Sequence, residues 1–540
     1  MHNGARKKTG SPYRSPNCPN MRSLRLGALV LGAALVSSCG GGGDSAPAAL
    51  PSVAGHNVDV SFQIVIPQAS ASASKRRPAY ISAATQSATV SVNGASTTVN
   101  CTSVCSATVS APVGSDTFTV NLFSAQNAGG SLLSTGTVTQ SIVADQANSV
   151  NVTFNGVVAS LSLALSASQL TVGTPALVMV TVKALDAAGN TIVGPGGYAT
   201  ATGAALTLAL SDSDLSGATT LSQTSLSAPP TSAITLFYNS TAIADPKITL
   251  SAGSLTPQNK TLGMTDTFNY TGTTQRLTVP AGVTTMHAVV NAGESGTGNG
   301  AYTLAGAAVT ANLSVSAGST LTVIVGNSAP LFPAGSYSAF GGGGAAGESF
   351  ISGSSTFSGP GGGASAVFAA SGPLVVAGAP GGADGDGISQ GGSAGGYAGI
   401  ASGVPFAGGT LFSGGNGGSD TGSSPGIGGL GGGTSGGTFG ASATSGGCTA
   451  ATTGTTASSS SVGVGGSGSA CTSGNNYGGG GGGGGYTAGG GGGSGPNNST
   501  NGNAPGGGGG GGGSSFVSGS ATLVSIATSN FNAGSVVLTW

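Results

Sequence analysis

A glycine-rich tract covers residues 340–513, is about two-fifths glycine and contains no Lys or Arg. Glycine has no side chain to bury and loses more backbone entropy on ordering than any other residue. Two interpretations are open. The tract is a flexible coil, or it forms packed polyglycine-II helices, which have three residues per turn and bond to one another laterally. Phe368, Leu374 and Phe412 within the tract favour a real core.

The chain is unusually poor in charge. Its 540 residues include 13 Lys and Arg and 14 Asp and Glu, 5% in all, against about 25% in an average protein. Nucleic-acid binding is excluded, because neutralising phosphates takes clusters of basic residues. The chain also has few residues that could transfer protons in catalysis, since these are mainly His, Glu, Asp and Lys. We therefore expect a non-catalytic protein without a cofactor.

Residues 1–38 have the pattern of an export signal. A short basic stretch at 21–25 is followed by an apolar run at 26–36 and by two serines. The run is shorter than the ~20 apolar residues that a membrane-spanning helix needs. Residues 1–20 are either an extension of the basic region or an over-long start, so the true start is Met1 or Met21.

The end of this signal, residues 35–39 (Leu-Val-Ser-Ser-Cys), resembles the lipobox of bacterial lipoproteins. That resemblance implies that Cys39 is lipidated and becomes the first residue of the mature chain, with 40–55 as a flexible linker. The alternative is an ordinary signal peptide cut near residues 46–48. We expect an exported protein held at a bacterial membrane, at the outer membrane or cell surface.

Processing at Cys39 changes the charge balance. Six of the 13 basic residues precede Cys39 and none of the 14 acidic ones does, so the remainder carries a formal charge of −7 instead of −1. A mild net negative charge on an exported chain favours solubility and does not favour binding to anionic partners.

Four further cysteines fit an oxidising compartment. With Cys39 as the anchor, the even number left suggests two local disulfides, Cys101–Cys105 and Cys448–Cys471. A zinc site at Cys101 and Cys105 is disfavoured, because only His56 and His287 remain to complete four ligands.

Residues 56–155 alternate between apolar and polar side chains, which predicts a β-sandwich. The predicted strands contain Val58 to Ile66, Val90 and Val92, Phe118 to Leu122, and Val150, Val152 and Phe154. Asn93-Gly94 is a hairpin signal.

Residues 156–262 repeat this alternation and predict a second sandwich. Within it, residues 180–190 (Val-Thr-Val-Lys-Ala-Leu-Asp-Ala-Ala-Gly-Asn) resemble a strand and turn of bacterial immunoglobulin-like domains from surface adhesins. The resemblance implies a spacer module.

An ordered set of motifs marks residues 265–540. It comprises Phe-Asn-Tyr-Thr-Gly at 268–272, Val-Pro-Ala-Gly-Val-Thr at 279–284, Gly-Ser-Thr-Leu-Thr-Val-Ile-Val-Gly at 318–326, Gly-Gly-Gly-Ala-Ser-Ala-Val at 361–367 and Ser-Ser-Phe-Val-Ser-Gly at 514–519. This region resembles the glycine-rich domain of many bacterial secreted proteins, which is similar to the glycine-rich ectodomain of anaplastic lymphoma kinase. The resemblance implies a jelly-roll-like sandwich with a glycine-rich insert, here about 341–513. The chain departs from that family after Ser365, where the family often has Asp and then Arg.

Asp384 and Asp386 are a weak calcium candidate, because two carboxylates flanked by glycines can join backbone carbonyls around the ion. Repeat-type calcium sites recur at a fixed period and this pair occurs once, so a polar turn is the preferred interpretation.

Together these features predict an all-β cell-surface lipoprotein with a structural or adhesive function. Its partners would be the membrane through the lipid, and an extracellular matrix, polysaccharide or protein ligand. One alternative is an extracellular carbohydrate-active enzyme or its accessory module, although only Glu294, Glu348 and scattered Asp residues could supply the paired acids. Another is a secreted ligand-binding or signalling module, by analogy with the receptor ectodomain.

Overall fold

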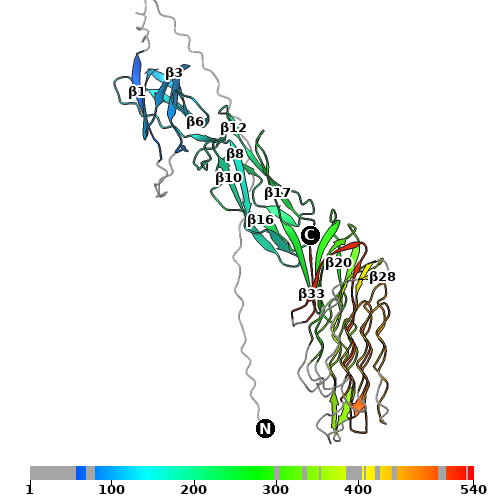
Figure 1. Ribbon diagram of the computed structural model, residues 1–540. Coiled ribbons are helices and arrows are strands. Elements are labelled where there is room, and N and C mark those ends of the chain that lie inside the picture. Colours follow the sequence, from blue (N-terminus) through cyan, green and yellow to red (C-terminus); the bar gives the residue numbers. More distant parts are fainter. Residues whose placement is uncertain are drawn as a thin grey trace, which may run out of the picture. The chain divides into compact units, whose positions relative to one another are not determined.

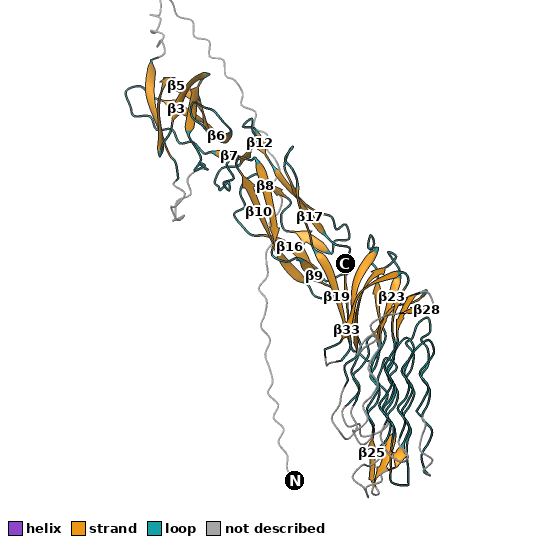
Figure 2. Ribbon diagram, viewed as in Figure 1, coloured by secondary structure: helices purple, strands orange, loops and turns teal. Residues whose placement is uncertain are grey.

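A computed structural model describes residues 56–67, 80–296, 304–330, 337–351, 354–384, 404–406, 409–419, 426–440, 447–496, 506–530 and 533–540. Within these ranges all regular elements are β-strands (Figures 1 and 2), so the predicted all-β class is confirmed. The part of the chain so described includes no helix long and apolar enough to cross a membrane. Cys39, the export signal and the linker lie outside these residues.

The first sandwich packs a two-stranded sheet against a larger one. The small sheet pairs β1 (Asn57–Val65) with β4 (Val104–Pro112). The larger sheet has the order β12 (Ala205–Leu206), β11 (Tyr198–Ala199), β7 (Asn155–Val157), β6 (Leu132–Ile142), β5 (Gly114–Phe123), β2 (Ser87–Val92) and β3 (Ala95–Asn100). The rings of Phe62 and Phe118 lie between the two sheets, with their centroids 5.5 Å apart.

Two local predictions for this sandwich have different outcomes. Asn93 and Gly94 connect β2 to β3 with φ of 46° and 91°, so the predicted hairpin is confirmed. The prediction of a strand at Val150, Val152 and Phe154 is wrong. These side chains pack on the first core, but residues 149–154 belong to no described strand. Alternation alone sets which side chains face inward, and a strand also needs a neighbour that pairs with its backbone.

The first sheet includes strands from later in the chain. β11 pairs in parallel with β7, and β12 continues the sheet beyond β11. Strands from both sides of residue 156 therefore share one sheet.

The second sandwich contains two four-stranded sheets. One has the order β14 (Thr219–Leu221), β16 (Ile234–Tyr238), β10 (Ala176–Leu185) and β8 (Ser160–Leu165), and the other β15 (Ser225–Leu226), β13 (Leu208–Asp212), β17 (Lys247–Ser251) and β18 (Gln258–Thr261). Their alternate side chains form one core that includes Leu163, Val180, Leu208 and Leu236. The alternation in the sequence indicated this inward face.

The third sandwich is larger and carries the glycine-rich insert. Its first sheet has the order β33 (Ala521–Thr528), β22 (Ala307–Ser314), β21 (Thr285–Asn291), β34 (Ser535–Thr539), β19 (Gly263–Asn269) and β9 (Gln169–Thr171). Its second has the order β20 (Gln275–Thr278), β23 (Thr320–Ile324), β26 (Ser365–Ala369), β27 (Gly372–Ala377), β32 (Ser515–Ser518), β29 (Gly409–Phe412) and β28 (Val404–Phe406). Residues of both sheets share one core.

A small sheet lies within the insert itself. It has the order β25 (Ser354–Phe357), β24 (Glu348–Ile351), β30 (Asn476–Tyr477) and β31 (Gly495–Pro496).

A buried carboxylate joins the first two sandwiches. Asp186, in the turn after β10, accepts hydrogen bonds from the hydroxyls of Tyr80 (2.7 Å) and Ser82, which precede β2. It also accepts from the backbone N–H groups of Ala188 and Asn190, each at 2.9 Å. Burial would raise the pKa of Asp186, but these four hydrogen bonds to its charged form outweigh burial and hold the pKa below its ordinary value.

This pKa gives the stability a predictable dependence on pH. Because the folded chain binds the proton less readily than the unfolded chain, Asp186 contributes stability above its unfolded pKa of about 3.9 and loses it as the pH falls through its folded value. We expect the Tm of wild type to fall more steeply between about pH 5 and pH 2 than the Tm of Asp186→Asn. The control is Asp145→Asn, an exposed carboxylate at a φ of 57°, which suits Asn. Equal slopes for wild type and Asp186→Asn would contradict this role.

Candidate functional site: the glycine-helix bundle

The described part of the insert forms a bundle of extended segments that run side by side (Figures 1 and 2). We call it the glycine-helix bundle. Its segments are residues 341–347, 359–363, 378–384, 414–418, 426–433, 436–440, 452–456, 462–469, 478–485, 487–493 and 506–513. Almost none of these residues belongs to a β-strand, yet their backbones are hydrogen-bonded throughout.

The hydrogen bonds of residues 478–485 repeat with a period of three. Their N–H groups point in turn to three neighbouring segments, with N···O distances of 2.8–3.1 Å: Gly479 and Gly482 donate to Ser469 and Gly466, Gly480 and Gly483 to Gly508 and Gly511, and Gly481 and Gly484 to Gly359 and Gly362. A period of three is the geometry of a polyglycine-II helix, in which successive backbone groups point outward 120° apart.

The carbonyl groups of the same helix reach three other neighbours. At N···O distances of 2.7–3.0 Å they accept from Gly347 and Gly344, from Gly492 and Gly489, and from Gly382 and Ala379. Residues 478–485 therefore bond to six surrounding segments, which is hexagonal packing. For the described part of the insert, the structure shows the packed-helix alternative and not the coil.

Residues 487–493 form a second interior helix of the same kind. Its backbone bonds to segments 427–430, 437–440, 452–455, 466–469, 480–483 and 508–511. Two neighbouring helices, each with six partners, give the bundle an interior made almost wholly of peptide groups. Such an interior satisfies buried N–H and C=O groups as a sheet does.

This packing explains why glycine is required. A Cβ built on Gly482 would lie 2.0 Å from the carbonyl oxygen of Gly489, and one built on Gly510 would lie 2.0 Å from that of Gly481. These neighbours are backbone atoms, which cannot rotate aside. At these positions a side chain could enter only if the neighbouring backbone moved.

Side-chain hydroxyls complete the backbone bonding where strands meet the bundle. Ser365 Oγ accepts from the N–H of Gly326 (2.9 Å), Ser515 Oγ from Gly378 (3.0 Å) and Ser349 Oγ from Gly478 (2.8 Å). We did not predict these roles. The signal available in the sequence was a serine at the point where each glycine run meets a strand.

Some outer helices present a side chain at every third position. In residues 461–469, positions 461, 464 and 467 are the most exposed and the others are buried. Ile427 and Leu430 follow the same spacing and are 45% and 46% exposed. Phe439 is exposed on the adjacent helix, which is joined to theirs by a 2.9 Å bond from Leu430 N–H to Thr438 C=O. We call Ile427, Leu430 and Phe439 the apolar ridge.

The structure contains both predicted disulfides. Cys101–Cys105 closes the turn between β3 and β4, and Cys448–Cys471 joins two segments of the insert that are 23 residues apart in sequence. Persisting disulfides are typical of an extracellular or otherwise oxidising compartment.

The remaining candidate residues do not form a cluster. Asp384 is buried at the end of the segment 378–384, and Asp386 lies outside the described residues. Burial raises the pKa of Glu294, which follows β21, whereas Glu348 begins β24. Over the ranges given above, no group of three or more His, Cys, Asp or Glu is placed to hold a metal ion.

The bundle makes a sharp prediction about glycine replacement. We expect Gly482→Ala to destabilise the third sandwich by about 3 kcal/mol or more, because backbone must move to admit the methyl group. Gly433→Ala is the matched control: its Cβ would meet nothing nearer than Ser413 Oγ at 4.0 Å, so we expect a change within about 1 kcal/mol. Thermal and urea denaturation of the purified chain measure both. Similar losses in the two variants would contradict the hexagonal packing.

Comparison with known proteins assigns no family. No protein-family model and no curated protein matches the chain. Among solved structures, it is similar to a β-glycosidase from Bacteroides vulgatus (10% identity, TM-score 0.16, covering 33% of this chain and 21% of that one). It is also similar to domains 1–6 of the surface layer protein SbsC (14% identity, TM-score 0.15, covering 54% and 30%). The chain spans about a third or less of the length of these structures, and the similarities are distant.

Proposed function

We propose that this chain is a lipid-anchored cell-surface protein whose glycine-helix bundle is a non-catalytic adhesive surface. The observation that carries the proposal is the outer face of the bundle, where a hydrogen-bonded backbone presents uncharged side chains, at every third position in residues 426–430 and 461–469. Three residues of such a helix span about 9 Å, so neighbouring side chains keep a fixed spacing. The charge-poor composition and the two disulfides support an extracellular setting.

The chemistry of the ridge suggests the class of ligand. Ile427, Leu430 and Phe439 are apolar, and exposed Thr and Ser residues lie on nearby helices, as at Thr453. Apolar faces together with hydroxyl groups suit an uncharged polymer, such as a neutral polysaccharide. The packed backbone fixes the ridge before binding, which lowers the entropy that binding must overcome.

The adhesive function is tested by changing the ridge alone. We expect the double variant Ile427→Asp/Leu430→Asp to bind neutral polysaccharides on a glycan array about tenfold or more weakly than wild type, because it places two charges in the contact. Leu177→Asp is the control, since Leu177 is also exposed (62%), on β10 of the second sandwich.

Two results would contradict the adhesive proposal. One is a loss of binding in Leu177→Asp as large as in the double variant. The other is release of reducing sugar from the polysaccharide that disappears in Glu294→Gln, because that result would show catalysis.

The anchor is tested separately. We expect cells grown with labelled palmitate to label the wild-type chain and the control Cys18→Ser, and to leave Cys39→Ser unlabelled. Loss of the acyl chains removes the apolar contribution of about 0.8 kcal/mol per buried CH₂, so Cys39→Ser should appear in the medium. Labelling of Cys39→Ser would contradict lipidation at that residue.

A further inference from the structure

One edge of the first sandwich has no partner strand within the described part of the chain. β1 pairs with β4 and with no other strand among the described residues. The bonds Ile66 N–H to Ser103 C=O and Val113 N–H to His56 C=O, both 3.0 Å, fix which residues bond across this pair. In an antiparallel pair, every second residue of a strand points its N–H and C=O groups toward the partner strand, and the residues between point theirs away from it. Even-numbered residues of β1 therefore bond to β4, and the N–H and C=O groups of Asp59, Ser61, Gln63 and Val65 point away from it. We call this the open edge.

A second stretch of backbone, without partners among the described residues, lies near the open edge. Residues 149–153 make no backbone hydrogen bond within the part of the chain that the structure describes. Val150, Val152 and Phe154 nonetheless alternate inward onto the first core. The stretch crosses β6 where β6 has a glycine: a Cβ on Gly136 would lie 2.5 Å from Val152 Cγ1.

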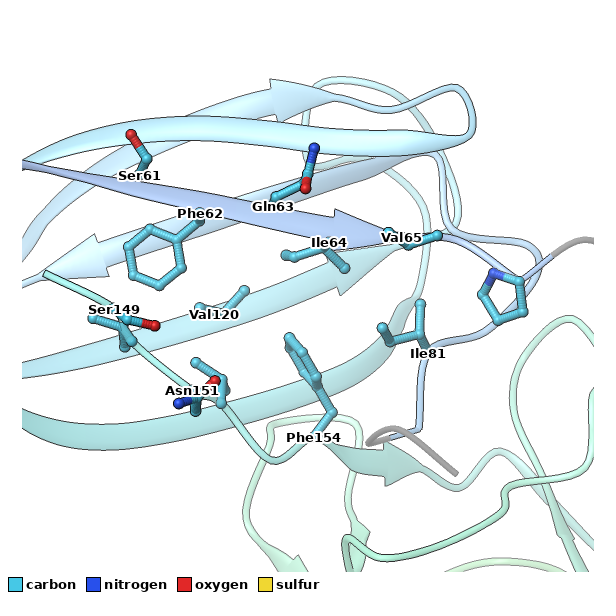
Figure 3. Close-up of a pocket in the computed structure, with 13 residues that line it drawn as sticks. Ser61, Phe62, Gln63, Ile64, Val65, Ile81, Val120, Ser149, Asn151 and Phe154 are labelled. Atoms are coloured by element: carbon cyan, nitrogen blue, oxygen red, sulfur yellow. The ribbon is translucent and has the colours of Figure 1, made fainter. Parts of the chain in front are cut away.

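An apolar groove separates the open edge from residues 149–153. Its volume is about 560 Å³. Figure 3 shows Phe62, Ile64, Val120, Ile81 and Phe154 gathered between β1 and this stretch. Among the described residues, none that lines the groove carries a charge. As far as the described residues go, the groove thus has the three features of a site for a missing strand: an unpaired edge, an apolar floor and a far wall that also lacks backbone partners.

We propose that the groove receives a strand from another polypeptide, which pairs with the open edge of β1. The occupant is an uncharged, extended segment with apolar side chains at alternate positions. Its backbone bonds to Ser61 and Gln63, and every second side chain enters the groove beside Phe62 and Ile64. The uncharged lining favours this occupant, because a charged side chain there would lose its water without gaining a partner. Addition of a strand to a sheet edge is a recurring mode of peptide recognition.

The required length of the occupant follows from the edge. Asp59 to Val65 is seven residues, or about 23 Å of strand. A seven-residue peptide is therefore the shortest that uses the outward backbone groups of Asp59, Ser61, Gln63 and Val65. This site lies in the first sandwich and does not depend on the adhesive role of the bundle.

The probe is the blocked peptide acetyl-Thr-Val-Thr-Val-Thr-Val-Thr-amide, added to the full chain, with a peptide carrying Lys at the central Val as control. We expect the probe to slow hydrogen exchange at the outward amides of Asp59, Ser61, Gln63 and Val65 and in no other strand, and the control peptide to leave it unchanged. Absence of binding, or protection of these four amides before peptide is added, would overturn the proposal. The latter result would show that the chain fills the groove itself.

A matched pair of variants tests the edge. Ser61 and Thr108 are opposite each other in the β1–β4 pair and both are exposed. By the same alternation, Thr108 points its N–H away from β1, toward the other edge. We expect Ser61→Pro to weaken probe binding at least tenfold by calorimetry and Thr108→Pro to leave it within twofold. Equal effects of the two variants would overturn the proposal.

A third variant keeps the test decisive if Ser61→Pro does not fold. Ile81→Lys places a charge in the groove and leaves the β1–β4 pair intact. We expect it to weaken probe binding at least tenfold. Unchanged binding by Ile81→Lys would overturn the proposal.

Discussion

Lateral hydrogen bonding between glycine helices is the interaction on which the insert depends. Ordering a glycine costs more backbone entropy than ordering any other residue, and a glycine tract has almost no apolar side chains to compensate. The compensation comes from hydrogen bonds: each of the two interior helices is hydrogen-bonded to six neighbouring segments. Close approach is possible only without Cβ atoms, so the residue that makes ordering costly is also the residue that allows the bonding.

The third sandwich supplies the fixed starting points for this packing. Residues 359–363 lead directly into β26, residues 378–384 follow β27, and residues 506–513 lead into β32. Since β26, β27 and β32 are neighbours in one sheet, three of the helices are already side by side where they leave it. Holding the ends of a loop lowers the entropy that its ordering must still overcome.

The sequence predicted local structure better than it predicted which strands and helices pair with one another. Alternation at Phe62, Ile64 and Phe118 identified buried faces, and Asn93-Gly94 identified a turn, because both depend on residues close in sequence. It did not predict that β9 and β11 join the sheets of neighbouring sandwiches, since pairing is made by backbone groups common to all residues. For the same reason it could not name the six neighbours of residues 478–485. The strand expected at Val150 is not formed, because no strand in the described ranges pairs with this stretch.

The placement of β34 between β21 and β19 has a consequence for biosynthesis. Asn269 of β19 pairs with Ser535 of β34, so the ribosome must make the whole glycine tract before this sheet can close. Contacts that distant in sequence form slowly. Until then β19 has an unpaired edge, and the nascent third sandwich stays incomplete. A chain that completes its core only after synthesis of β34 therefore remains incompletely folded for longest in the region that carries the bundle.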